Sequence, residues 1–103
     1  MKRKAIGVVS IVILIVSFQL VAKEDKEGYE DCILEHVSGT EDALAANFMT
    51  YACHRLFIDN FMLSEKDQGY FQCLLDYLPD AKKAEITLQI KHVCNEKHRS
   101  LFW

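Results

Sequence analysis

Apolar residues recur with the period of an α-helix along four segments of the chain. The first segment has an apolar face made of Tyr29, Cys32, Ile33, His36 and Val37. The third segment has the corresponding face Tyr70, Cys73, Leu74, Tyr77 and Leu78. The second segment has the face Ala45, Phe48, Met49, Ala52, Cys53 and Leu56. The fourth has the face Ile86, Ile90, Val93 and Cys94, and this face also includes the polar residue Gln89. Because an amphipathic helix buries such a face, the pattern predicts an all-α fold of about four helices packed on one core.

Turn and capping residues separate these segments. Gly39 can take the left-handed conformation at the end of the first helix, and Pro79 cannot continue the third. The predicted N-caps of the second, third and fourth helices are Ser38 in a capping box with Glu41, Ser64 with Asp67, and Asp80. The run at 57–63 is too apolar for a flexible linker, so we expect it to pack the two halves together.

Four cysteines divide the helical region into two similar halves. Within each half the two cysteines are 21 positions apart, and the second pair lies 41 positions after the first. Superposing repeats 29–57 and 70–98 without a gap matches Tyr29 with Tyr70, Cys32 with Cys73, Leu34 with Leu75, Ala43 with Ala84, and Cys53 with Cys94. The spacing predicts an internal repeat, and hence two helical hairpins within one four-cysteine domain over 29–103.

An even number of cysteines in a short exported chain indicates disulfides, and four cysteines allow three connectivities. Helical hairpins favour pairing within the halves, Cys32 with Cys53 and Cys73 with Cys94. Counting from the turn, the cysteines of the first half are offset by roughly 9 Å along antiparallel helices. The helices must therefore cross steeply or the loop must climb along one of them, and pairing between the halves stays open.

The N-terminus has the order of a secretory signal. Residues 1–4 are basic, 5–16 are almost wholly apolar, and 17–22 are more polar and end at the small residue Ala22. We expect a signal peptide over 1–22, followed by an acidic spacer over 23–28. The alternative is an uncleaved anchor, since 18 residues from 5 to 22 can span a bilayer. The domain is then periplasmic or secreted, or it is anchored to the inner membrane outside the cytoplasm.

The charge of the exported part restricts its partners. From Lys23 onward there are 9 Lys and Arg against 15 Asp and Glu, a balance of −6 with the histidines neutral. Such a balance argues against nucleic acid and against anionic lipid. We expect a protein partner, with the membrane contacted only through the N-terminal segment if that segment is uncleaved.

The first half resembles a known family. The run 29–39, Tyr-Glu-Asp-Cys-Ile-Leu-Glu-His-Val-Ser-Gly, continues through an alanine-rich stretch at 42–46 to Ala-Cys-His-Arg at 52–55. It resembles the repeat of small exported bacterial four-cysteine proteins, in which the unit occurs twice. The second half departs from that pattern, with Pro79 and Asp80 in place of the Ser-Gly turn and Val93 before Cys94. The resemblance implies no particular activity.

Candidate catalytic and metal-binding residues are few. Cys94 and His98 share a helical face and could hold a metal, but two disulfides would consume every thiol and structural zinc has tighter ligand spacing. A redox Cys-x-x-Cys motif is absent, and His36 on an apolar face fits a hydrogen-bonded core-edge residue. We therefore expect no cofactor, no metal and no enzymatic activity.

Aromatic and apolar residues say more about a possible binding surface than the histidines do. They are Phe57, Phe61, Tyr70, Phe71 and the C-terminal Leu101, Phe102 and Trp103. Most of them can supply the core of a small helical domain, and the terminal tripeptide either docks back or meets a partner. The sequence predicts a non-catalytic exported binding module, such as an inhibitor, an immunity-type protein or an envelope accessory protein. The alternative is a small metal-handling or thiol-dependent enzyme that uses its histidines and cysteines.

Overall fold

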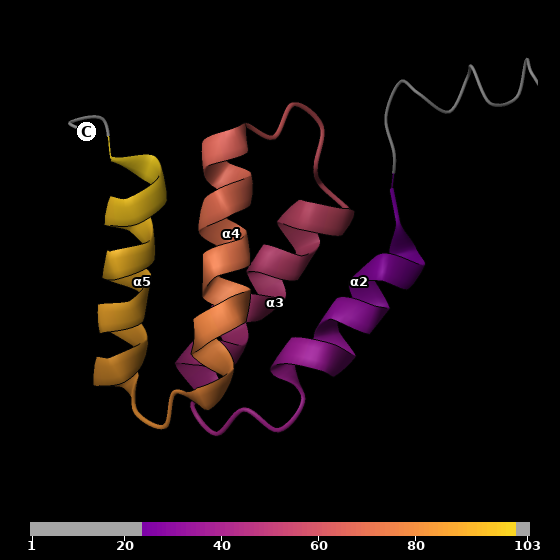
Figure 1. Ribbon diagram of the computed structural model, residues 1–103. Coiled ribbons are helices and arrows are strands. Elements are labelled where there is room, and N and C mark those ends of the chain that lie inside the picture. The colour runs from indigo at the N-terminus through magenta and orange to yellow at the C-terminus, as the bar shows by residue number, and fades with distance from the viewer. Residues whose placement is uncertain (1–23, 101–103) are drawn as a thin grey trace, which may run out of the picture.

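The computed structural model describes residues 24–100, and these form four α-helices with no β-strand among them (Figure 1). The helices are α2 (Lys26–Cys32), α3 (Ala43–Phe57), α4 (Glu65–Tyr77) and α5 (Ala84–Arg99). A π-helical turn, Ile33–Val37, extends α2, and a 3-10 turn, Leu78–Asp80, follows α4. The predicted signal or anchor at 1–22 and the C-terminal tripeptide lie outside the described residues. The predicted all-helical class is confirmed.

Successive helices run in opposite directions and pack beside one another (Figure 1). The helix α4 lies between α3 and α5 and contacts both, while α2 with its π-helical turn packs on α3. The helix α3 also contacts α5 directly. The described helices therefore share one core instead of forming two separate hairpins.

Polar side chains cap three of these helices. Asp25 accepts a hydrogen bond from the Gly28 amide over 2.8 Å at the start of α2. The predicted cap at Ser64 is confirmed, because its hydroxyl oxygen accepts from the Asp67 amide over 3.1 Å. The predicted box of Ser38 with Glu41 is wrong.

The helix α3 begins four residues later than that box requires, and its N-cap is Asp42, which accepts from the Ala45 amide over 3.0 Å. The predicted cap at Asp80 is also wrong, because Asp80 ends the 3-10 turn and the chain needs an extended stretch to reach α5. Lys83 occupies the N-cap position of α5 without a side-chain hydrogen bond.

Two residues adopt positive φ in the described loops. Gly39 has φ 85°, as predicted for the end of the first helical segment. Met62, in the loop between α3 and α4, has φ 57°, which is unusual for a side chain other than glycine. The prediction that 57–63 packs inward is only half right: Phe57 and Leu63 pack against the core, whereas Phe61 and Met62 are 63% and 86% exposed.

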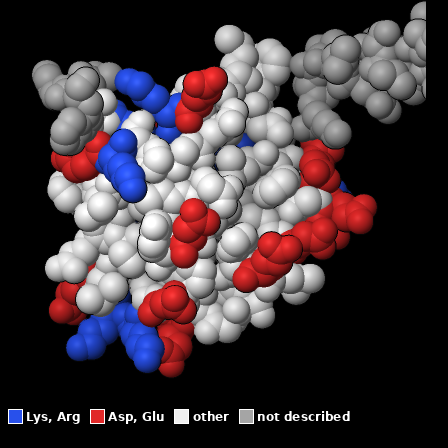
Figure 2. All heavy atoms as spheres, in the orientation of Figure 1, with Lys and Arg blue, Asp and Glu red and all other residues white. Residues whose placement is uncertain are grey.

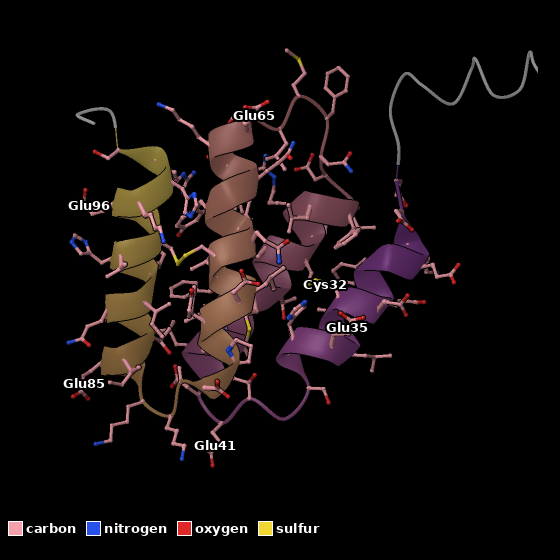
Figure 3. All side chains as sticks on the ribbon, viewed as in Figure 1. Cys32, Glu35, Glu41, Glu65, Glu85 and Glu96 are labelled. Atoms are coloured by element: carbon pink, nitrogen blue, oxygen red, sulfur yellow. A yellow bond between two sulfur atoms is a disulfide. The ribbon has the colours of Figure 1, made fainter. Side chains whose placement is uncertain are left out.

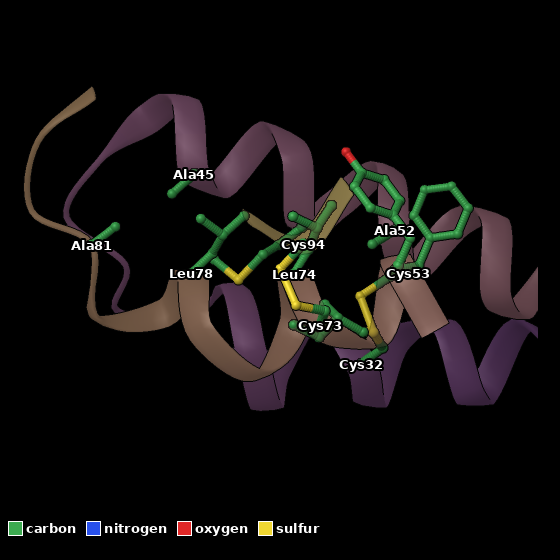
Figure 4. Packing of buried hydrophobic residues seen from close by; sticks show 13 residues of the cluster. Cys32, Ala45, Ala52, Cys53, Cys73, Leu74, Leu78, Ala81 and Cys94 are labelled. Atoms are coloured by element: carbon green, nitrogen blue, oxygen red, sulfur yellow. A yellow bond between two sulfur atoms is a disulfide. The ribbon is translucent and has the colours of Figure 1, made fainter. Parts of the chain in front are cut away.

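The core is built from small, sulfur-containing and large apolar side chains in close contact (Figure 4). Its fully buried large members are Phe71, Met49, Leu74 and Leu78. All four cysteines lie among them, so the core and the covalent links occupy the same space. A domain this small has limited apolar area to bury, and cross-links inside the core supplement it.

The predicted inner face of α5 is wrong in part. Ile86 and Val93 are 42% and 58% exposed, whereas Thr87 is completely buried and Cys94 is 1% exposed. In the third predicted face, Tyr77 is likewise exposed at 60%. The helix α5 is rotated relative to the expectation because the polar side chain of Thr87, not the apolar side chain of Ile86, has a partner inside the domain.

Candidate functional site

Disulfides join Cys32 to Cys53 and Cys73 to Cys94, so the pairing runs within the halves. The Cα atoms are 5.8 Å apart in the first and 5.7 Å apart in the second. Figure 3 shows a disulfide between the facing sides of α4 and α5. None of the four cysteines is free. Two disulfides indicate an oxidising compartment outside the cytoplasm.

The histidines considered as ligands do not gather with other donors. Cys94 is bonded to Cys73, and the His98 ring packs against the backbone of Gly69, where an added Cβ would stand 2.7 Å from Nδ1. His36 lies at the core edge, 3.8 Å from the carboxylate of Glu35. Within residues 24–100, no three potential ligand residues converge as a metal site would require. In the same range, no helix has the length and apolarity needed to cross a membrane.

Two of the predicted aromatic residues, Tyr70 and Phe71, form the floor of a cavity of about 350 Å³ between α3, α4 and α5. They are 3% and 2% exposed and pack edge to face, with ring centroids 5.2 Å apart. We call this cavity the aromatic pocket; its lining residues are Phe48, Tyr51, Tyr70, Phe71, Leu74, Lys91 and Arg99. The other predicted aromatic residues, Phe57 and Phe61, do not line it.

Arg99 closes one side of the aromatic pocket at the end of α5. Its guanidinium carbon lies 4.2 Å from the ring centroid of Tyr70 and 5.9 Å from that of Phe71. Its Nε donates to the Asp67 carboxylate over 2.9 Å, which restrains the guanidinium plane. A guanidinium stacked on an aromatic face in this way is held in place by the attraction between the cation and the ring.

Two more cations stand around the same rings. The Lys91 ammonium lies 5.3 Å from the ring centroid of Phe48 on the opposite side of the aromatic pocket. The Arg55 guanidinium carbon lies 5.6 Å from the Phe71 centroid, and its hydrogen bond to the Tyr51 hydroxyl raises the pKa of Arg55. Two arginines therefore lie over the aromatic floor, each near a carboxylate: Arg99 beside Asp67 and Arg55 beside Asp59.

Acidic side chains lie both away from the aromatic pocket and at its edge, where Asp67 pairs with Arg99. In Figure 2 many of them lie over α2, at the side of the domain away from α5. The aromatic pocket draws its lining from α3, α4 and α5, and its lining includes no carboxylate. The lining therefore carries two cations, Lys91 and Arg99, and Arg99 is paired with Asp67, which lies outside the lining.

Sequence reasoning found the floor of this site but missed its cations. Lys91 and Arg99 look like ordinary solvated residues of a helix surface, and they meet the rings of Phe48 and Tyr70 only after three helices have packed. The available signal was their spacing of eight positions, about two helical turns, on the helix that carries Cys94. In a partly enclosed, apolar cavity, flanking cations suit an anionic group attached to an apolar body.

Comparison with known proteins yields one similarity. No curated protein sequence and no solved structure matches the chain. The family model described as four-cysteine protein VF_A0006-like matches residues 9–98, which include all four cysteines and nearly all of the described helices. No function accompanies that description. The chain therefore belongs to the four-cysteine protein VF_A0006-like family.

Proposed function

We propose that the protein is a non-catalytic exported binding module whose aromatic pocket receives a carboxylate next to an apolar side chain of a partner protein. The observation that carries this proposal is the Arg99 guanidinium stacked 4.2 Å over Tyr70 at the edge of a cavity of about 350 Å³. A buried aromatic floor supplies apolar contact area, and the cation supplies the charge-assisted hydrogen bonds that orient an anion.

Export to the periplasm or beyond supports this role. The basic and apolar order of residues 1–22 is that of a secretory signal or an anchor, and two disulfides suit an oxidising compartment. A stapled helical domain presents a binding surface that is already ordered before the partner arrives. Little conformational entropy is then lost on association, which favours a recognition role such as that of an inhibitor, an immunity-type protein or an envelope accessory protein.

The charge distribution supports selectivity for a local feature of the partner. The exported part has 9 basic against 15 acidic residues, so strongly acidic proteins are repelled overall. Lys91 and Arg99 reduce that repulsion locally at the aromatic pocket. A partner therefore gains affinity when one carboxylate, placed beside an apolar side chain, reaches this cavity.

The test uses two small probes that differ by one charge, N-acetylphenylalanine and its amide. Titrated into oxidised, isotope-labelled protein, the carboxylate should shift the amide resonances of residues lining the aromatic pocket, with a dissociation constant on the order of 1 mM for a ligand of this size. The uncharged amide should bind several-fold more weakly. Added salt should weaken binding of the carboxylate and leave the amide nearly unaffected.

Matched lysine variants separate the aromatic pocket from general charge. Lys91→Gln removes a cation from the pocket, whereas Lys82→Gln removes an exposed one that does not line it. We expect weaker carboxylate binding only in Lys91→Gln. Equal binding of the two probes, or equal loss in the two variants, would refute the proposed carboxylate site.

A photo-crosslinking amino acid tests for a protein partner in cells. Tyr51 lines the aromatic pocket and is 54% exposed, whereas Tyr77 is 60% exposed and lines a different cavity. The crosslinker at Tyr51 should give a discrete adduct that Lys91→Gln diminishes. The same adduct in equal yield from Tyr77 would place the contact elsewhere and contradict the proposal.

A further inference from the structure

The loop between α3 and α4 presents two large apolar side chains outward. Phe61 and Met62, which we call the loop tip, are 63% and 86% exposed. The loop around them is held by hydrogen bonds: the Leu63 amide donates to the Asn60 carbonyl, and the Asn60 side chain donates to the Leu56 carbonyl. The exposure of the loop tip is thus part of an ordered turn.

The backbone at the loop tip is strained in a way that favours this exposure. Met62 has φ 57°, a conformation that side chains other than glycine rarely adopt. The neighbouring Leu63 packs against the core, so the chain turns sharply at Met62 to bury one apolar residue and expose two others. Strain retained at an exposed apolar position points to a contact outside the domain.

The loop tip lies at the end of the domain where the N-terminal segment joins. The Asp25 amide donates to the Phe57 carbonyl over 2.8 Å, which places the start of α2 beside the end of α3, four positions before Phe61. At the same end, Arg99 is bonded to Asp67, so α5 finishes beside the start of α4 (Figure 1). The apolar stretches 5–22 and 101–103 both connect to the described domain at this end.

We propose that, in the full-length chain, this end of the domain rests on a lipid bilayer and the loop tip inserts into its interface. The apolar segment at 5–22 has the length to enter a bilayer, and the described domain begins beside Phe57, at the end that carries the loop tip. Once that segment is in the membrane, the loop tip is confined near the surface at high effective concentration. The membrane segment then holds the domain at the bilayer, and the loop tip sets which end of the domain faces it.

The headgroups selected by this contact are neutral ones. The exported part is acidic, and both signs of charge flank the loop tip, with Asp59 before it and Glu65 and Lys66 after it. Attraction to anionic lipid is therefore weak, and insertion of Phe61 and Met62 depends on burial of apolar surface. Binding driven by apolar burial is insensitive to salt.

The experiment measures contact of single tryptophans with acyl chains. Full-length protein with Trp103→Phe is reconstituted in phosphatidylcholine vesicles with and without brominated acyl chains, which quench tryptophan on contact. We expect the tryptophans of Phe61→Trp and Met62→Trp to lose much of their emission to the brominated chains. Their emission should also shift to shorter wavelength on binding the vesicles, and salt at about 0.5 M, roughly three times the physiological level, should not reverse that shift. The controls are Leu88→Trp and Leu34→Trp, at positions 52% and 69% exposed and away from the loop tip.

All four substituted positions are exposed, and thermal unfolding of each variant confirms that it keeps the fold. Quenching at positions 61 and 62 with little at 34 and 88 supports the proposal. Equal quenching at all four positions, or none at 61 and 62, overturns it. Emission at 61 and 62 that changes only when a protein partner is added, and not with brominated lipid, also overturns it and assigns the loop tip to a protein interface.

Discussion

Thr87 donates a hydrogen bond from its hydroxyl to the Asp42 carboxylate over 2.7 Å, joining residues 45 positions apart. The same carboxylate oxygen accepts from the Ala45 amide over 3.0 Å, so one atom both caps α3 and holds α5. Thr87 is completely buried, and a buried hydroxyl needs a hydrogen-bond partner inside the protein. This contact fixes the rotation of α5 about its axis.

The first prediction removes this link. Thr87→Val keeps the side-chain volume but leaves the Asp42 carboxylate with one hydrogen bond fewer, so we expect a loss of about 1.5–3 kcal/mol in the free energy of unfolding. The measurement is urea unfolding of the oxidised protein, read as a lower midpoint at unchanged slope. Thr87→Ser, which retains the hydroxyl, serves as the control and should lose less. A midpoint equal to that of the unmodified protein in Thr87→Val would mean that the bond adds nothing to stability.

The second prediction concerns the two disulfides. Both close loops with a sequence separation of 21, so chain entropy predicts nearly equal stabilisation from Cys32–Cys53 and Cys73–Cys94. Replacing either pair with alanines should lower the free energy of unfolding by about 3 kcal/mol. Urea unfolding of the two double variants measures this directly. A loss confined to one pair would show that differences in core packing outweigh loop closure.

Much of the fold could be predicted because helical periodicity and turn chemistry act locally. The faces around Cys32, Cys53 and Cys73, the cap at Ser64 and the left-handed Gly39 depend on neighbours within a few residues. The rotation of α5 was missed because Thr87 is turned inward by Asp42, which is far away in the sequence. Local apolar pattern favoured Ile86, and a tertiary hydrogen bond overrode it.

In the candidate site, too, some residues could be predicted from the sequence and others depend on tertiary contacts. Tyr70 and Phe71 could be singled out because aromatic residues are few and conspicuous. Lys91 and Arg99 could not, because a surface cation and a cation stacked on a ring have the same sequence pattern. The distinction depends on which helix packs beside which, and that is set by the whole core.

The third prediction isolates backbone strain at Gly39. Its φ of 85° lies in the left-handed region, and a Cβ added there would meet no atom within 4 Å. Gly39→Ala therefore introduces no clash, and the expected loss of about 1–2 kcal/mol comes from conformation alone. Gly39→Asn, which tolerates this region better, should retain more of the stability. Urea unfolding midpoints of the two variants decide the matter, and a midpoint for Gly39→Ala at or above the original would contradict it.

The fourth prediction tests whether Arg99 acts through its planar stack or only through its charge. Arg99→Lys keeps the positive charge but loses the guanidinium face over Tyr70, at 4.2 Å, and the fixed geometry of the bond to Asp67. Since the side chain is 38% exposed, the expected loss in the free energy of unfolding is modest, about 0.5–1 kcal/mol.

Arg55→Lys provides the comparison, because the Arg55 guanidinium lies farther from the Phe71 ring, at 5.6 Å. Its loss should be smaller than that of Arg99→Lys when both are measured by urea unfolding at low salt. Charge alone predicts no loss in either variant, since lysine retains it. A clear loss in Arg99→Lys that persists in high salt therefore assigns the effect to the guanidinium geometry, that is, to the stack on Tyr70 together with the directed hydrogen bond to Asp67, and not to charge.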